Sequence, residues 1–245
     1  SSAASDVYKR QKAAWAAADS LSRKSIYVRT TFTSQQKKVK QAVVNICGLG
    51  LYELSINGKK VGNSEFTPLI SDYDKSVWYN TYDVTTLLQK GNNAIGVLLG
   101  NGFYNVQGGR YRKLLISFGP PTVRLQLTIH YEDGTSQTVA SDKTWKYDFS
   151  PVTFNCIYGG EDYDARQEQK GWNMAKFNDT LWNQVVVQEG PKGVLRPQIA
   201  APVAIMEHYS PISATHLPDS LLAAASKSTK RKVDASAIVL DMGQN

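Results

Sequence analysis

The sequence contains few of the residues that build metal clusters or disulfide frameworks. Its 245 residues include two cysteines and three histidines. Cys47 and Cys156 have no Cys or His near them at metal-ligand spacing, which excludes the common zinc motifs. Cys47 lies in an apolar stretch, where a buried thiol is expected. Whether the two cysteines pair depends on the fold, and the sequence leaves this open.

Several other features are absent. No run of about 18 apolar residues occurs, so no membrane-spanning helix is predicted. The sequence also has no nucleophile elbow, phosphate loop or dinucleotide fingerprint. The net charge is +7, and part of it lies in a basic run near the C-terminus that has no interleaved aromatic residues. We therefore expect a solvated loop there and no nucleic-acid partner. This run comprises Lys227, Lys230, Arg231 and Lys232.

The residues that are present predict a β-rich fold. Asn57-Gly58 lies between two β-prone runs, and both residues tolerate positive φ, so a tight two-residue hairpin is predicted. Residues 123–131 alternate between apolar and polar side chains, and Asp133-Gly134 then turns the chain into a returning strand at 136–140. The side chains expected to be buried are those of Leu51, Leu54, Ile56, Val97, Leu125, Leu127 and Ile129.

Two short helical segments are also expected. Asp83 can cap a helical turn at 84–88, and Gly91 can end it. Residues 12–22 are rich in alanine, which favours a helix. On this interpretation, the first strand begins near Ser25.

Five motifs follow one another along the chain: Gly50-Leu51-Tyr52-Glu53-Leu54, Asn57-Gly58-Lys59-Lys60-Val61-Gly62, Thr81-Tyr82-Asp83-Val84-Thr85, Gly159-Gly160-Glu161-Asp162-Tyr163-Asp164-Ala165-Arg166 and Gly171-Trp172. Taken in this order, they resemble the N-terminal β-sandwich of bacterial α-L-rhamnosidases. The resemblance implies an all-β fold, a jelly-roll or galactose-binding-like β-sandwich with few short helices. Near the C-terminus, Asp241-Met242-Gly243-Gln244-Asn245 is similar to the segment that opens the second β-sandwich domain of that family.

The resemblance also sets the expected domain boundaries. Residues 1–11 resemble a translated adapter from DNA library preparation and are left out of the fold. Residues 12–25 are interpreted as an N-terminal remnant, and residues 26–198 as the sandwich. Residues 199–245 are interpreted as a linker and the truncated beginning of a concanavalin-like β domain. We expect the true N-terminus, with any signal peptide, and the catalytic domain to be missing.

The function implied by the resemblance is that of a glycoside hydrolase. Its members release terminal non-reducing α-L-rhamnose with inversion, and their catalytic carboxylates lie in a later helical barrel. No catalytic residue is therefore predicted in this chain, which is expected to be inactive alone. The expected partners are rhamnose-containing glycans and the missing catalytic domain, in the periplasm or outside the cell. Two alternatives stay open: a stand-alone carbohydrate-binding module, and a structural sandwich that supports the barrel.

Two long loops, at 63–78 and 101–112, are candidates for sugar contact. For the second loop, an equally good interpretation is a packed crossover loop of the sandwich. The candidate substrate-binding residues are Asp72, Tyr73, Asp74, Asn101, Tyr104 and Tyr111.

No cofactor is required, but the resemblance includes modules that bind rhamnose through Ca²⁺. Calcium prefers oxygen ligands. Here such ligands could come from Asp72, Asp74, Asn101 and Asn105. A second acidic cluster contains Glu161, Asp162 and Asp164. We interpret it as structural, with Glu161 and Asp164 bonded to backbone amides and to Arg166.

Overall fold

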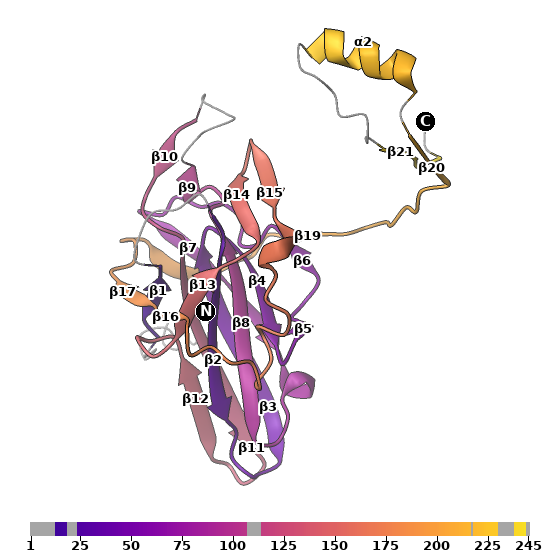
Figure 1. Ribbon diagram of the computed structural model, residues 1–245. Helices are drawn as coiled ribbons and strands as arrows, with labels where there is room; N and C mark the ends of the chain where they lie inside the picture. Colours follow the sequence, from indigo (N-terminus) through magenta and orange to yellow (C-terminus); the bar gives the residue numbers. More distant parts are fainter. Residues whose placement is uncertain (1–12, 19–23, 107–113, 217, 230–237, 244–245) are drawn as a thin grey trace. The chain divides into compact units, whose positions relative to one another are not determined.

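The computed structural model describes residues 13–18, 24–106, 114–216, 218–229 and 238–243. The chain divides into two units, Ser1–Ala204 and Ile205–Asn245. The first unit contains two large β-sheets and several small ones (Figure 1). Among its described residues, the second unit contains a two-stranded antiparallel sheet and one helix, and each unit is described by itself below.

The first large sheet has seven strands, and its pairings are antiparallel apart from the one between the strands at 76–83 and 194–197. One strand, β12, pairs with part of β11 beside the main path. In path order the strands are β17 (Val186–Gln188), β1 (Trp15–Ala17), β11 (Thr122–Tyr131), β3 (Val39–Leu49), β7 (Ser76–Asp83) and β18 (Val194–Pro197), with β12 at Ser136–Ala140.

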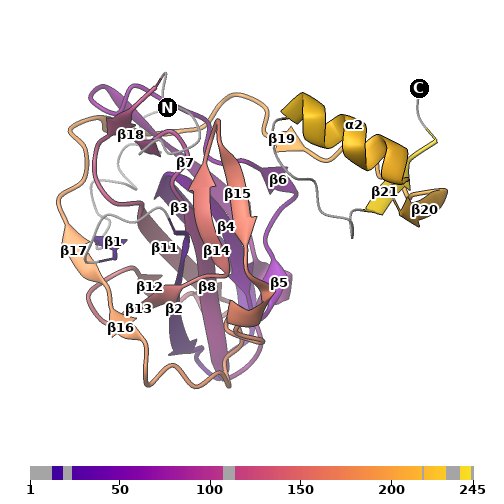
Figure 2. The same cartoon turned by 45° about the horizontal axis from the view of Figure 1, so that its top comes forward.

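The second large sheet has six strands, and β8 lies near its centre. Val97 of β8 is in register with Val28 on one side and with Leu54 on the other. The two sheets form the layers of a sandwich (Figure 2). In path order the strands are β16 (Asn183–Gln184), β13 (Lys146–Phe149), β2 (Ile26–Thr33), β8 (Asn92–Gly100), β4 (Leu51–Ile56) and β5 (Lys59–Lys60).

The hydrophobic core draws on both large sheets. Along β11 the predicted alternation is confirmed, because every second side chain from Val123 to Tyr131 is buried. Of the side chains expected in the core, Leu51 is only half-buried. Each fully buried Leu, Ile or Val stabilises the fold by about 1.5–3 kcal/mol relative to exposure. The other expected members are all buried: Leu54, Ile56, Val97, Leu125, Leu127 and Ile129.

The predicted hairpin at Asn57-Gly58 is also confirmed. Both residues have positive φ, 52° and 80°, and β4 pairs with β5 through Ser55 and Lys60. The short helix is a 3₁₀ turn at Thr85–Leu87. Asp83 Oδ1 accepts hydrogen bonds from the backbone N–H and the hydroxyl of Thr85, at 2.9 and 2.6 Å.

The helix expected at 12–22 is wrong for the part that the structure describes. Residues 15–17 form β1, which pairs with β11 on one side and with β17 on the other. Ala16 and Ala17 are fully buried there. Alanine has the highest helix propensity, but propensity is a weak preference that tertiary contacts override. Here the sheet supplies the hydrogen bonds on both sides of the segment.

Three small two-stranded sheets lie in the first unit beside the two large ones. They are β14 (Val152–Cys156) with β15 (Gly160–Tyr163), β9 (Asn105–Val106) with β10 (Ile116–Ser117), and β6 (Ser64–Glu65) with β19 (Val203–Ala204). In Figure 1, β9, β10, β14 and β15 lie toward the top of this unit. The loops expected to contact sugar are therefore held by short strands.

The second unit consists of β20 (Ser213–His216), α2 (Asp219–Thr229) and β21 (Ile238–Asp241). Its two strands pair antiparallel, with Ser213 opposite Asp241. Lys227 of the basic run is exposed on α2, and the rest of that run lies outside the described residues. Within the part of the chain that the structure covers, no helix is long and apolar enough to cross a membrane.

Candidate carbohydrate-binding site

The loop before β7 is a compact turn centred on Asp72. The Asp72 carbonyl accepts hydrogen bonds from the N–H groups of Lys75 and Ser76, at 2.9 and 2.8 Å. Its side-chain Oδ1 accepts from the Asp74 N–H at 3.2 Å. Asx-type bonds of this kind fix the chain direction in turns. The turn thus sets the positions of Tyr73 and Asp74.

Asp72 is also held by a cation. Its carboxylate lies 2.9 Å from Lys75 Nζ. The hydrogen bond from Lys75 holds the pKa of Asp72 below its usual value. The carboxylate is therefore charged at neutral pH, and one of its faces is occupied by the lysine.

A cavity of about 230 Å³ lies where the two predicted loops meet. Asp72, Tyr73 and Asp74 contribute from the first loop and Phe103 from the second. We call it the Asp72 cavity. Its lining is mostly apolar, with a few polar groups, which is typical of ligand sites. The remaining lining residues are Ile70, Ser71, Leu114, Ile116 and Phe118.

Tyr73 belongs to an aromatic cluster behind this cavity. Its ring packs edge-on against the Tyr104 ring, with the centroids 5.1 Å apart. The centroids of the Tyr73 and Phe118 rings are 5.2 Å apart. Burial raises the pKa of Tyr73 to about 12. Tyr104 is buried and does not line the cavity. Edge-to-face pairs of this kind add about 0.5–1.5 kcal/mol beyond area burial, so Tyr104 supports Tyr73.

Asn101 and Asn105 lie in the interior. Asn101 Oδ1 accepts a hydrogen bond from Asn105 Nδ2 at 2.7 Å, and Asn105 Oδ1 accepts from Ser117 Oγ at 2.8 Å. Both residues are about 1% exposed, and neither lines the Asp72 cavity. Their amide oxygens are used by protein donors, so they do not fit as calcium ligands beside Asp72 and Asp74.

No group of three or more His, Cys, Asp and Glu side chains is placed to hold a metal ion among the described residues. Tyr111, another candidate for sugar contact, lies in 107–113, outside those residues. Sequence reasoning did not select Phe103 or Phe118 for the site. Both are aromatic residues in loops, and no periodic pattern shows which face of a loop meets solvent.

Comparison with known proteins adds to this geometry. Residues 37–207 match the family model described as the alpha-L-rhamnosidase N-terminal domain. The chain belongs to this family. The match covers both large sheets apart from β1 and β2 at their N-terminal side, and it includes both loops of the Asp72 cavity.

The relatives of this rhamnosidase domain are much longer than the chain. An alpha-L-rhamnosidase of Alteromonas sp. is 32% identical over 224 residues, which is 89% of the chain and 22% of the relative. One from Formosa agariphila is 45% identical over 150 residues, covering 60% of the chain and 16% of the relative. The chain thus spans about a fifth of the length of the curated relatives it matches.

Solved rhamnosidases share the fold. The structure of the Aspergillus terreus enzyme matches with a TM-score of 0.79 and 31% identity, covering 96% of the chain and 26% of the enzyme. The Streptomyces avermitilis enzyme complexed with L-rhamnose matches with a TM-score of 0.69 and 32% identity. This match covers 82% of the chain and 19% of the enzyme. The β-sandwich predicted from the sequence is thereby confirmed.

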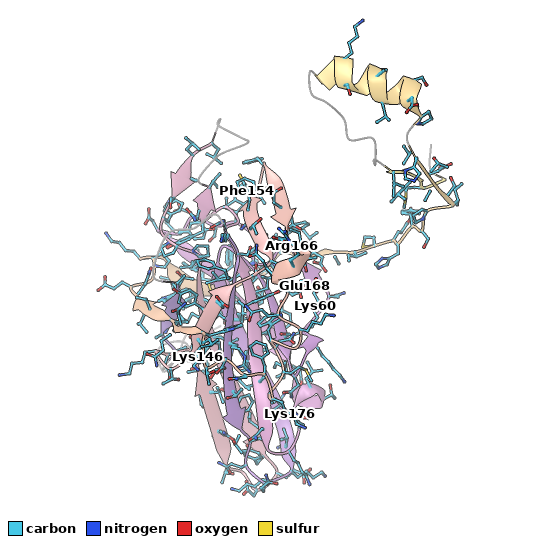
Figure 3. The ribbon with its side chains drawn as sticks, in the orientation of Figure 1. Lys60, Lys146, Phe154, Arg166, Glu168 and Lys176 are labelled. Atoms are coloured by element: carbon cyan, nitrogen blue, oxygen red, sulfur yellow. The ribbon has the colours of Figure 1, made fainter. Side chains whose placement is uncertain are left out.

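In the rhamnosidase domain the second acidic cluster is partly structural. Asp164 accepts hydrogen bonds from Arg166 Nε and Nη2, both at 2.8 Å, and from the Arg166 N–H at 3.1 Å. The bond from Arg166 holds the pKa of Asp164 well below its usual range. Figure 3 shows Arg166 just beyond β15. The interpretation of Asp164 is confirmed, whereas Glu161 is exposed and lines a different cavity.

Proposed function

We propose that this domain is the non-catalytic N-terminal part of an alpha-L-rhamnosidase. The parent enzyme releases terminal non-reducing α-L-rhamnose with inversion. The observation that carries the proposal is the match of residues 37–207 to the N-terminal domain model. The chain spans about a fifth of the length of its relatives. The sandwich then serves to support the catalytic region and its substrate.

The acids of the domain agree with a non-catalytic role. An inverting hydrolase needs a carboxylic acid and a carboxylate about 6.5–9.5 Å apart, and the acid needs a raised pKa. Asp72 and Asp164 instead have lowered pKa values, caused first by Lys75 and Arg166. Asp74 and Glu161 line different cavities. Asp72 and Asp164 are therefore unsuited to act as the general acid.

A hydrolysis assay tests this proposal. The chain and the full-length protein are each incubated with a chromogenic α-L-rhamnoside. We expect turnover by the full-length protein only, with the opposite anomer as the first product seen by NMR. Turnover by the chain alone, abolished by Glu161→Gln, would overturn the proposal.

A second function, sugar binding, is favoured by one observation. The two loops selected from the sequence meet at the Asp72 cavity, and the Asp74 carboxylate there has no ion pair or side-chain hydrogen bond within the described residues. We propose that Asp74 accepts hydrogen bonds from a terminal rhamnose, with Phe103 beside the sugar.

An NMR titration with L-rhamnose tests sugar binding at this cavity. Asp74→Asn should weaken binding about tenfold, the effect of losing a charge-assisted hydrogen bond. Glu132→Gln, a matched change at an exposed acid outside the cavity, should leave binding unchanged. We expect EDTA to have no effect, since the amide oxygens of Asn101 and Asn105 already accept protein hydrogen bonds. Equal binding by both variants would contradict the proposal.

A further inference from the structure

A second groove shares no lining residue with the Asp72 cavity. It consists of two adjoining cavities, the larger of about 350 Å³, and we call it the Phe66 groove. Its lining includes Leu51, Gly102 and Phe66, together with residues of the β14–β15 hairpin. The residues common to both cavities are Leu51, Phe66, Gly102, Asn155 and Glu161.

Phe66 is an aromatic residue held in the open. The residue is 65% exposed, and its φ of 49° lies in the left-handed region. That conformation costs a bulky L-residue about 1–2 kcal/mol, and such residues gather at functional sites. Other apolar side chains of the chain are as exposed, such as Leu181 and Ile199, but Phe66 combines exposure with a left-handed backbone and a place in the lining of both cavities.

The backbone on both sides of Phe66 is fixed. Glu65 is paired with Val203 in the β6–β19 sheet. On the other side, the Thr67 carbonyl accepts a hydrogen bond from the Tyr52 N–H at 2.8 Å, and Thr67 Oγ1 donates to Asn80 Oδ1 at 3.0 Å. The ring therefore presents a pre-organised apolar face, which lowers the entropy cost of binding.

The part of the lining contributed by the β14–β15 hairpin is also fixed. The Asn101 N–H donates to Asn155 Oδ1 at 2.7 Å, and Asn101 Nδ2 donates to the Asn155 carbonyl at 3.3 Å. Asn155 of β14 is the register partner of Glu161 of β15. The internal hydrogen bonds of Asn101 thus anchor the hairpin that carries Glu161.

Glu161 offers an available acceptor. Its side chain is exposed, and its carboxylate has no hydrogen bond or ion pair within the described residues. Glu53 also lines the groove, but its carboxylate lies 3.2 Å from Lys60 Nζ. The groove therefore combines one apolar ring with a free carboxylate and a second, paired one.

We infer that the Phe66 groove binds a neutral pyranoside, with the C–H face of the sugar on Phe66 and two neighbouring hydroxyls donating to Glu161. An aromatic face carries partial negative charge, which attracts polarised C–H groups. A carboxylate is an acceptor only, and it can receive two hydroxyl protons. Two carboxylates at one groove disfavour an acidic sugar, because like charges repel. The groove is thus a sugar site separate from the Asp72 cavity.

The choice of a rhamnoside as probe rests on the proposed function, whereas the site itself rests on the groove. The test is an NMR titration of the chain with methyl α-L-rhamnoside, methyl α-D-glucoside and methyl α-D-glucuronide. We expect amide shifts at Phe66, Asn155 and Glu161 with at least one neutral glycoside and none with the glucuronide. The absence of such shifts with both neutral glycosides would overturn the inference.

Variants identify the contacts. Phe66→Ala and Glu161→Gln should each weaken binding at the groove about tenfold, whereas Phe66→Tyr, which keeps the ring, should retain it. Phe118→Ala is the matched control, because Phe118 is 47% exposed and lines the Asp72 cavity. Dispersed amide spectra of each variant show that it folds.

Unchanged groove binding by Phe66→Ala, or an equal loss with Phe118→Ala, would contradict the inference. Hydrolysis by the full-length protein is a separate readout. A full-length protein that binds at the groove but hydrolyses no rhamnoside would overturn only the proposed function.

Discussion

Arg29 and Asp179 form an ion pair that fastens the loop before β16 onto the second sheet. The Arg29 side chain is fully buried, and that of Asp179 is 22% exposed. Arg29 Nη2 also donates to the Met174 carbonyl at 2.9 Å, and the guanidinium lies 5.4 Å from the Phe177 ring centroid. Lys146 is labelled in Figure 3, and its Nζ lies 2.8 Å from Oδ1 of the same aspartate. One carboxylate therefore holds two cations.

Removing that carboxylate should destabilise the domain strongly. Asp179→Ala leaves the buried guanidinium of Arg29 without a counter-charge, which costs about 3–5 kcal/mol in the free energy of unfolding. Urea denaturation measures the loss. Arg29→Met combined with Asp179→Ala should recover part of it, because the unpaired charge is gone.

The exposed pair of Lys38 and Glu132 provides the control. Exposed ion pairs contribute roughly 0–1 kcal/mol, so Glu132→Ala should change stability little. A loss with Glu132→Ala as large as that with Asp179→Ala would contradict the assignment of the buried pair.

The Asn57 hairpin predicts a difference between two substitutions. Asn57 has a φ of 52°, and its side chain bonds Leu87, Asn93 and Ala94 at 2.8–2.9 Å. Asn57→Ala loses these hydrogen bonds and keeps a Cβ atom in the left-handed region, where no side-chain hydrogen bond then offsets its steric cost. Asn57→Gly loses the bonds but relieves the backbone. Alanine should therefore be less stable than glycine by about 1–2 kcal/mol, measured by thermal unfolding, and equal stabilities would refute the backbone argument.

The turn between β11 and β12 should respond to acid. A hydrogen bond from Lys37, followed by bonds from Thr135, lowers the pKa of Asp133 from 3.8 to about 2. Because the folded pKa is depressed, the carboxylate contributes stability above pH 3.8, and this is lost as the pH falls through about 2. NMR titration of the Asp133 carboxyl carbon gives the midpoint.

Lys37→Met should move that midpoint up toward 3.8, the ordinary value. Lys38→Met removes a neighbouring cation that pairs with Glu132, so it should leave the midpoint in place. The same midpoint in all three proteins would show that Lys37 does not cause the shift.

The cysteines provide a chemical test of the fold. Both are free and buried, and burial raises the pKa of the Cys47 thiol far above its usual value. Thiolates react and thiols do not, so Cys47 should resist a thiol reagent at neutral pH in the native domain. Two thiols should react after denaturation without reductant. Fewer than two would indicate a disulfide.

Local sequence patterns predicted the parts of the fold that depend on local chemistry. The alternation from Val123 to Tyr131 and the Asn57-Gly58 turn each act over a few residues, so they were visible without the structure. Strand β1 was missed because its conformation comes from β11 and β17, far away in sequence. The parallel pairing of β18 with β7 has no local signal for the same reason.

The candidate sites also combine features that local sequence shows with features that depend on distant contacts. The sequence identified the loop containing Asp72 and Asp74, since long aperiodic loops are often functional. It did not show that Asn101 and Asn105 face inward, because an asparagine looks the same whether its partner is solvent or another buried amide. The left-handed φ of Phe66 was also hidden, since it depends on contacts made by Glu65 and Thr67.

The strands that end the two sheet paths bear on how the domain behaves at high concentration. They are two to four residues long: β5, β16, β17 and β18. β5 consists of two exposed lysines, and β18 ends in a proline that has no N–H to donate. Short, charged or proline-containing edges are poor templates for strand addition from another molecule. These four edges are thus protected against strand addition, while the Asp72 cavity and the Phe66 groove stay open to small solutes.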